Sequence, residues 1–299
     1  MDGALVVDKP EGPTSHDVVA VARRALATRE IGHTGTLDPM ATGVLVLVAG
    51  RATRLARFLS GAEKAYDVTV RLGVETDSGD RTGVVIGEHS VHPADPGLPA
   101  VRDALDGLTG TREQLPPPLS AKRLGGVRAY TLARAGADVP VRPVVVTLFE
   151  AAIVGYEPPW LRLSVRCSAG FYVRALARDL GRRLGCGASL DALRRTVNGE
   201  FALSRSVPLD VLAADPAAAR AALIGIDDLL PGLASARLNE TGTRKARHGN
   251  DISPADVVGA LPLVEGDQAM RLVDEGGRLV AIARRAGQPG LLHPAVVLQ

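Results

Sequence analysis

The segment 32–43, which reads Gly-His-Thr-Gly-Thr-Leu-Asp-Pro-Met-Ala-Thr-Gly, constrains the fold more than any other part of the chain. Three glycines and one proline restrict its backbone closely between a predicted helix and a buried-type strand at 44–49. Asp38 is its single carboxylate. An Asp-Pro pair is a common turn dipeptide, but a lone carboxylate in a partly buried cleft can also act as a base or a nucleophile. The segment therefore predicts either a tight structural turn or a site in which Asp38 works nearly alone.

Several other chemistries are excluded by motifs that the sequence lacks. It contains no Gly-Lys-Ser/Thr phosphate loop, no GxGxxG, no HExxH and no GxSxG. His33 and Asp38 are too few ligands for a metal, and Cys167 and Cys186 lack the CxxC spacing of a zinc site. We therefore expect no metal. A carboxylate that stays ionised in such a cleft needs a cationic partner, which lowers its pKa by about 1–3 units.

The hydrophobic pattern predicts an α+β fold rather than a regular βαβ series. Thr14 and Asp17 form a helix-start signal, and apolar residues alternate with polar ones along 66–72 and 161–167. Segment 111–126 is predicted to be a projecting loop. The predicted strands are 4–7, 44–49, 66–72, 144–154, 161–167 and 189–204, and the predicted helices are 14–26, 99–108, 128–136, 171–184 and 207–230.

The charge balance gives no strong indication of a partner. The net charge is only +2, so a nucleic-acid surface would depend on where the charges lie. The N-terminus lacks the pattern of a signal peptide, and no apolar run approaches the roughly 20 residues of a membrane span. We expect a soluble, cytoplasmic protein that does not act at a membrane.

Taken as a whole, segment 32–43 resembles the catalytic loop of bacterial tRNA pseudouridine-55 synthases, the TruB family, whose pattern is G-H-T-G-x-L-D-P-x-A-T-G. Five further motifs are similar to those of the family: D-K-P-x-G at 8–12, K-x-Y at 64–66, L-G-x-x-T-D-T-x-D at 72–80, C-S-x-G-T-Y-I-R at 167–174, and G-C-G-A followed by L-R-R at 185–195. Two departures stand out. The family has an insertion with the pattern Q-x-P-P-x-Y-S-A-x-K, to which residues 114–122 are similar, but Leu119 replaces its tyrosine. The C-terminal residues also match the family poorly.

The resemblance implies a pseudouridine synthase fold, a mixed and largely antiparallel sheet flanked by helices, followed by a small PUA-like β module. It implies a catalytic domain at 1–232, with an RNA-binding insertion at about 111–140, and an RNA-binding module at 233–299. The implied reaction converts the T-loop uridine at position 55 of tRNA to pseudouridine without a cofactor. Asp38 would be the catalytic nucleophile or base; attack on the base, attack on the sugar and removal of a sugar proton all remain open.

The resemblance also implies roles for five substrate-binding residues. Tyr66 would stack on the target base, Tyr172 would line the same pocket, and Leu193 would form its apolar wall. Arg174 would pair with the catalytic carboxylate. His33 would take the place of the flipped base in the RNA stack, which makes physical sense because extruding a base costs a few kcal/mol of stacking.

Contacts to the RNA backbone are expected from cations outside this pocket, because phosphates are bound mainly by Lys and Arg. The candidates are Lys9, Arg123, Arg128, Arg244, Lys245 and Arg247. The expected partner is the T-stem-loop of tRNA, with no obligatory protein partner, and the chain is expected to be a monomer.

Two alternative functions were weighed against this enzyme. One is a tRNA-binding folding chaperone on the same scaffold, which the presence of Asp38, Tyr66 and Arg174 disfavours. The other is a guide-dependent rRNA pseudouridine synthase, which is disfavoured because the chain carries no extended basic tail.

Overall fold

The computed structural model describes residues 1–91, 96–117, 123–124, 127–128, 142–262, 266, 268–288 and 290–298. Within this part of the chain, an 11-stranded sheet forms the body. All its pairings are antiparallel except β1 with β14 and β3 with β12. The predicted mixed, largely antiparallel sheet is therefore confirmed. The order is β14 (Val207–Pro208), β1 (Gly3–Lys9), β3 (Thr42–Ala49), β12 (Ala188–Asn198), β4 (Lys64–Leu72), β11 (Trp160–Cys167), β10 (Val144–Glu157) and β7 (Gly110–Gln114), with β2 (Ile31–His33) on β3, β13 (Phe201–Ala202) on β12 and β15 (Ile224–Gly225) on β1.

The central strand β12 joins the two halves of this sheet. It pairs along its whole length with β4, and its residues Arg194 and Arg195 pair with Thr42 and Gly43 at the start of β3. Segment 32–43, which we call the glycine-rich loop, runs from the end of β2 to the start of β3. The topology therefore brings that loop beside the middle of the sheet.

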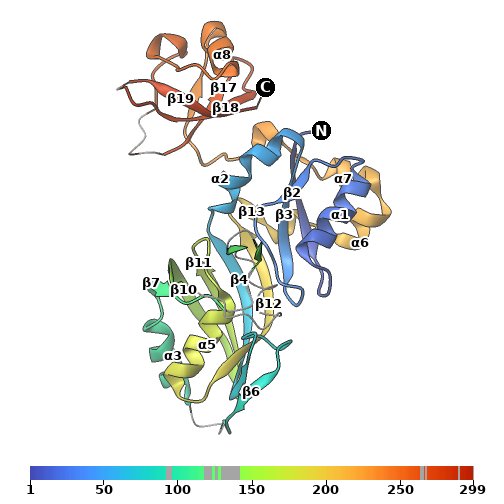
Figure 1. The fold of residues 1–299 in the computed structure, drawn as a ribbon, viewed down its shortest axis with the longest axis vertical. Helices are drawn as coiled ribbons and strands as arrows, with labels where there is room; N and C mark the ends of the chain where they lie inside the picture. The colour runs from blue at the N-terminus through green and yellow to red at the C-terminus, as the bar shows by residue number, and fades with distance from the viewer. Residues whose placement is uncertain are drawn as a thin grey trace.

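Helices cover one face of the sheet in two groups, as Figure 1 shows. Near β1 and β3 lie α1 (Ser15–Ala25), α6 (Leu209–Ala214) and α7 (Pro216–Ala221). In the second group, α3 (Leu98–Asp106) packs on β10, and α5 (Val173–Leu184) packs on β12 and on α3. The predicted start of the first helix is confirmed, because Thr14 and Asp17 form a reciprocal capping box. The remaining short elements of the body are η1 (Gly50–Leu55), α2 (Ala56–Ser60), β5 (Val74–Thr76), β6 (Val85–Glu88), β8 (Arg123–Leu124), β9 (Val127–Arg128), η2 (Leu203–Arg205) and η3 (Ile226–Asp228).

Burial differs between the two halves of the sheet. On β1 and β3 both faces are buried: Leu5 and Leu45 join the core under the helices, while Val6 and Val46 join a second core on the opposite face. This explains why these strands read as continuous apolar runs. On β11 buried and exposed residues alternate, as the sequence predicted for 161–167.

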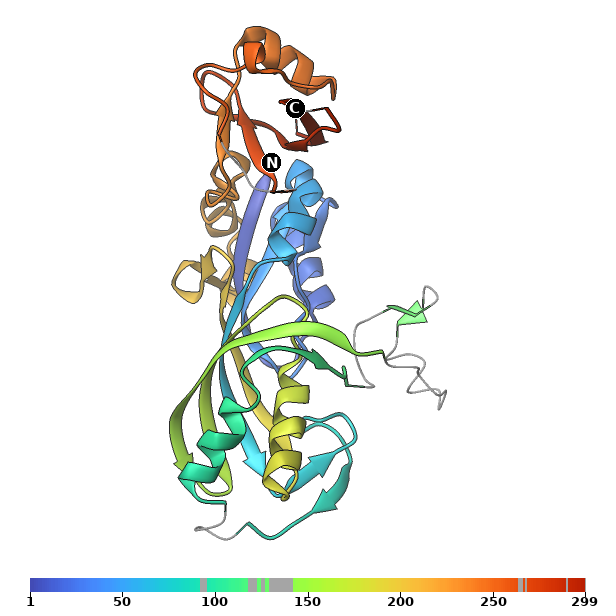
Figure 2. The same cartoon turned by 90° about the vertical axis from the view of Figure 1, so that its left-hand side faces the viewer.

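The C-terminal residues form a separate small sheet at one end of the elongated molecule (Figures 1 and 2). Its strands are β16 (Ser235–Arg237), β17 (Met270–Val273), β18 (Leu279–Arg285) and β19 (Leu292–Val297), which confirms the predicted β module. The module also contains α8 (Glu240–Arg247) and η4 (Pro254–Asp256), which the sequence reading did not predict. Asn239 caps α8 by accepting a hydrogen bond from the Gly242 amide.

The module packs directly on the body. Leu279 and Leu298 of the module belong to the same buried cluster as Leu55 and Leu230 of the body. Arg51 Nη1 donates a 2.9 Å hydrogen bond to the Leu298 carbonyl, which joins the two parts further.

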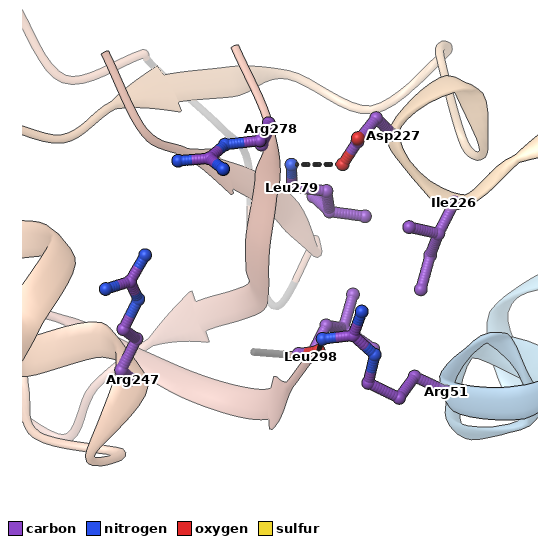
Figure 3. Close-up of a pocket in the computed structure, with 7 residues that line it drawn as sticks. All are labelled: Arg51, Ile226, Asp227, Arg247, Arg278, Leu279 and Leu298. Carbon is purple, nitrogen blue, oxygen red and sulfur yellow. Dashed lines mark hydrogen bonds between the residues drawn. The ribbon is translucent and has the colours of Figure 1, made fainter. Parts of the chain in front are cut away.

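A cavity of about 490 Å³ lies in this seam, lined by side chains from both parts (Figure 3). Three arginines point into it, but Arg51 pairs with Asp2 at 2.9 Å and Arg278 pairs with Asp274 at 2.9 Å. The lining residues are Arg51, Ile226, Asp227, Arg247, Arg278, Leu279 and Leu298. The cavity therefore has little uncompensated charge, and it lies apart from the glycine-rich loop.

Four predicted elements differ from the structure. The predicted strand 189–204 is divided, because β12 ends at Asn198, β13 follows at Phe201–Ala202 and η2 begins at Leu203. The predicted loop 111–126 begins instead with β7, whose backbone pairs with β10 from Val144 to Leu148. The predicted helix 207–230 is broken, because Asp215 ends α6 and caps α7 at Pro216. Of the predicted helix 128–136, only residue 128 is described, and it belongs to β9. Among the described helices, none combines the length and apolar character needed to cross a membrane.

Candidate active site

The glycine-rich loop is held by buried hydrogen bonds on the side away from solvent. Lys9 Nζ at the end of β1 donates to the carbonyls of Pro39 at 3.2 Å and Ala41 at 2.7 Å, on either side of Met40. Ser15 Oγ accepts from the Leu37 amide at 2.9 Å. The backbone on both sides of Asp38 is therefore fixed, and the Asp38 side chain keeps 34% of its surface exposed.

Arg174 in the first turn of α5 supplies the cationic partner of Asp38. Its Nε lies 3.0 Å from Oδ2, and its Nη2 donates to Oδ1 at 3.3 Å, so both carboxylate oxygens are bound. Only 8% of Arg174 is exposed. A forked pair of this kind fixes the orientation of the carboxylate as well as its charge.

A second carboxylate lies on the other side of Arg174. Asp80 Oδ2 is 3.6 Å from Arg174 Nη1, which also donates to the Ser78 carbonyl at 3.0 Å. Asp80 is 4% exposed and accepts hydrogen bonds from the Ser78 and Thr82 hydroxyls at 2.9 and 2.6 Å. Sequence reasoning gave Asp80 no role, although it ends the motif at 72–80. Asp80 and Asp38 together hold one guanidinium between them.

The pKa of Asp38 reflects this competition. Burial raises it above its usual value, the Arg174 charge lowers it, and the nearby Asp80 charge raises it again; the net direction is upward. The expected cation is therefore present, but burial outweighs it. A carboxylate whose pKa is raised is a stronger base than an ordinary aspartate.

Tyr66 and Leu193 lie on neighbouring strands next to this loop. Tyr66 on β4 is 6% exposed and Leu193 on β12 is 8% exposed, and both belong to the core under the helices. Burial raises the pKa of the Tyr66 hydroxyl, and the Asp38 charge is near enough to raise it further. The structure thus brings Asp38 within electrostatic reach of both Arg174 and Tyr66.

Tyr172 and His33 flank the site on two other elements. Tyr172 is the half-buried residue that precedes α5, and its backbone amide donates to Gln114 Oε1 at 2.8 Å. His33 ends β2 near the start of the loop, with its ring 5.4 Å from that of His16 in an edge-on arrangement. Tyr172 lies two residues before Arg174, the partner of Asp38.

The structure corrects the prediction for Lys9. Its side chain is fully buried, and its ammonium group is engaged by the carbonyls of Pro10, Pro39 and Ala41, so it cannot contact an RNA phosphate. Desolvation lowers its pKa to about 8. Lys9 is a structural support of the loop instead.

The other predicted phosphate contacts lie away from the loop or outside the described side chains. Arg244 and Arg247 are exposed on α8 of the module, while Lys245 beside them is bound to Asp256 at 2.8 Å (Figure 1). The side chains of Arg123 and Arg128, together with Leu119, lie outside the described residues. Within the described part of the chain, no group of three or more His, Cys, Asp or Glu could hold a metal.

Comparison with known proteins identifies the family. Residues 23–173 match the model of the TruB family pseudouridylate synthase N-terminal domain, and residues 174–230 match that of the tRNA pseudouridylate synthase B C-terminal domain. Two relatives carry the name tRNA pseudouridine synthase B. That of Solibacter usitatus is 42% identical over 100% of both chains, and that of Aromatoleum aromaticum is 47% identical over 78% of this chain and 74% of its own.

Solved structures share the fold at lower identity. A chain from "Structure of H/ACA RNP bound to a substrate RNA containing 2'-deoxyuridine" has a TM-score of 0.76 at 21% identity, covering 99% of this chain and 85% of that one. A chain from "Crystal structure of the archaeal box H/ACA sRNP Nop10-Cbf5 complex" has a TM-score of 0.74 at 22% identity, covering 99% and 86%. With two matching domain models and relatives at this identity, the chain belongs to the TruB family of pseudouridylate synthases.

Proposed function

We propose that this protein is a tRNA pseudouridine synthase that isomerises the T-loop uridine at position 55. The observation that carries the proposal is the half-exposed Asp38 carboxylate, bound through both oxygens by the buried Arg174, in a chain that belongs to the TruB family. The relatives with the name tRNA pseudouridine synthase B support tRNA as the substrate.

The reaction is an isomerisation and needs no net oxidant, reductant or water. The bond from N1 of uracil to C1′ of ribose breaks, the base turns, and C5 bonds to C1′ while the C5 proton leaves and N1 regains one. Asp38 acts as nucleophile or as base; attack on the base, attack on the sugar and removal of a sugar proton are each compatible with its exposure. Arg174 keeps the carboxylate oriented and favours its charged form.

Tyr66, Tyr172 and Leu193 are proposed to form the base pocket, with Tyr66 stacking on the uracil ring. His33, at the border of the loop, is proposed to fill the gap that the flipped base leaves in the RNA stack. Half-burial and contact with the His16 ring support this role, because an inserted side chain needs a defined orientation.

We propose that residues 1–232 form the catalytic domain and that 233–299 form a PUA-like module that contacts tRNA through Arg244 and Arg247. The separate sheet and separate core of the module support this division. We further propose that the protein acts in the cytoplasm as a monomer, without an obligatory protein partner. Size-exclusion chromatography with light scattering tests the oligomeric state.

Tritium release from a T-stem-loop RNA labelled at C5 of its uridines tests the function, because only C5 substitution frees that tritium. We expect turnover by the wild type, none by Asp38→Asn, and none on a stem-loop with cytidine at the target position. Tight binding of the stem-loop without release would indicate the tRNA-folding chaperone instead.

A further inference from the structure

Arg195 on β12 is a buried arginine to which the proposed reaction assigns no role. It is 1% exposed and is among the largest fully buried side chains of the described residues. Its backbone pairs with Gly43 on β3 and with Tyr66 on β4. It is therefore the cross-strand neighbour of both the residue that ends the glycine-rich loop and the tyrosine of the proposed base pocket.

The Arg195 side chain reaches the loop through three hydrogen bonds. Nε donates to the Val44 carbonyl at 2.6 Å, Nη2 donates to the Gly35 carbonyl at 3.2 Å, and Nη1 donates to the Thr36 carbonyl at 3.5 Å. Gly35 and Thr36 lie just before Asp38. One planar guanidinium thus ties β3 to the loop at Gly35 and Thr36, whereas Lys9 holds the carbonyls of Pro39 and Ala41.

Strands β3 and β12 lie very close together beside Arg195. A Cβ added at Gly43 would meet the Arg195 carbonyl oxygen at 2.2 Å, so β3 and β12 approach closely at this point. Side chains of directly opposed residues project from the same face of a sheet, so Arg195 and Tyr66 share one face. The Arg195 charge also acts on the Tyr66 hydroxyl, lowering its pKa against the effect of burial.

We propose that Arg195 is a positioning residue that fixes the loop backbone at Gly35 and Thr36 against the strand carrying Tyr66, and so sets the distance between Asp38 and the base pocket. The inference rests on the proposed pseudouridine synthase function. A lysine keeps the charge but offers no planar fork, so it cannot reach the three carbonyls together.

The first experiment compares Arg195→Lys with Arg194→Lys. Arg194 is the matched control: it is the adjacent arginine on β12, 39% exposed, and it pairs with Asp8 at 2.7 Å. A misplacement of about 1 Å in a catalytic group costs roughly 100-fold in rate. We therefore expect kcat for tritium release to fall about 100-fold in Arg195→Lys, with the Kd for the stem-loop within about threefold of the wild type, and little change in Arg194→Lys.

The second experiment is chemical rescue of Arg195→Ala by guanidinium ions at tens of millimolar. Guanidinium that enters the vacated space can restore the bonds to the loop carbonyls and raise kcat, whereas ammonium at equal concentration cannot. Since guanidinium does not stabilise proteins generally, a rescue would not come from a merely structural role. Asp38→Asn should respond to neither ion.

Three outcomes would overturn the proposal: wild-type kcat in Arg195→Lys, a loss confined to RNA affinity, or a folded Arg195→Ala that guanidinium does not rescue. If neither Arg195→Lys nor Arg195→Ala folded, Arg195 would be needed for the stability of the whole sheet, and this result would also overturn the proposal. If the wild type itself releases no tritium, the proposed function fails instead. Amide exchange at residues 35–38, faster in Arg195→Lys than in Arg194→Lys, still tests the positioning role.

Discussion

Arg174 Nε lies 3.0 Å from Asp38 Oδ2, although one residue belongs to the loop before β3 and the other to the first turn of α5. The same guanidinium reaches Asp80, so one buried cation serves two carboxylates. Because charges of opposite sign bind most strongly when both are partly withdrawn from water, this arrangement should control when Asp38 is ionised.

Replacing Asp38 by Asn should abolish turnover and leave the Kd for the T-stem-loop within about tenfold of the wild type, because affinity rests mainly on phosphate contacts and stacking. Filter binding and tritium release measure the two quantities on the same preparation. Turnover above about 1% of the wild type would remove Asp38 from the central role.

Arg174→Ala should lower kcat by several orders of magnitude, because it leaves Asp38 unpaired in a buried setting. The Arg174 charge lowers the pKa of Asp38, so its loss should move the acid limb of the kcat profile to higher pH. Arg174→Lys keeps the charge and should recover only part of the rate. A fully active Lys variant would mean that the forked pairing is unimportant.

Asp80→Asn should have two separable effects. The Asp80 charge raises the pKa of Asp38, so its removal should move the acid limb of kcat/KM to lower pH, opposite to Arg174→Ala. The plateau rate should also fall, because Arg174 loses one of its anchors. A pH–rate profile from pH 4 to 8 distinguishes these effects; a limb that moved upward would contradict the electrostatic account.

Lys9→Met should destabilise the protein, because each buried carbonyl left without a donor costs about 1–3 kcal/mol. The pKa of Lys9 is about 8 in the folded state and 10.5 ordinarily. Between these values the unfolded chain binds the proton and the folded one does not, so this group makes the wild type more stable as pH rises, by at most about 1.4 kcal/mol per pH unit.

The Lys9→Met variant lacks this pH-dependent contribution to stability. The difference in unfolding free energy between wild type and Lys9→Met should therefore widen between pH 7.5 and 9.5 in urea titrations. A difference that stayed constant across this range would show that burial does not lower the pKa of Lys9 in the folded protein.

Arg244→Gln should weaken binding of whole tRNA and reduce the slope of log affinity against log salt by about 0.7–0.9, the value for one phosphate contact. The short stem-loop should be affected less. Arg24 is a suitable control, since it is exposed on α1 away from the module. Equal effects of Arg24→Gln and Arg244→Gln would show that the module makes no specific contact with tRNA.

The sequence predicted the parts of the site that carry a family motif. Arg174 pairs with Asp38 in the structure, and the alternation along 66–72 and 161–167 identified the strands correctly. These features depend on the order of residues within short segments, and a single sequence contains all of that information.

Short sequence motifs did not reveal which cations are buried. The sequence makes Lys9 a candidate phosphate contact because phosphates are bound mainly by Lys and Arg, and only the folded chain brings three carbonyls around it. Arg195 belongs to a recognised motif, but its hydrogen-bond acceptors lie about 150 residues away in the chain. Two local signals were missed: Asn239, which caps α8, and the capping box of Ser253 and Asp256 at η4.

The central place of β12 has a consequence for synthesis on the ribosome. Strands β3 and β4 are complete by residue 72, but the strand that separates them is not finished until residue 198. Until then both keep an unpaired edge, which can bind other extended chains. The nascent chain must therefore protect these edges while residues 73–198 are synthesised. Neither Asp38 nor Tyr66 can reach its final setting before the synthesis of the last third of the chain begins.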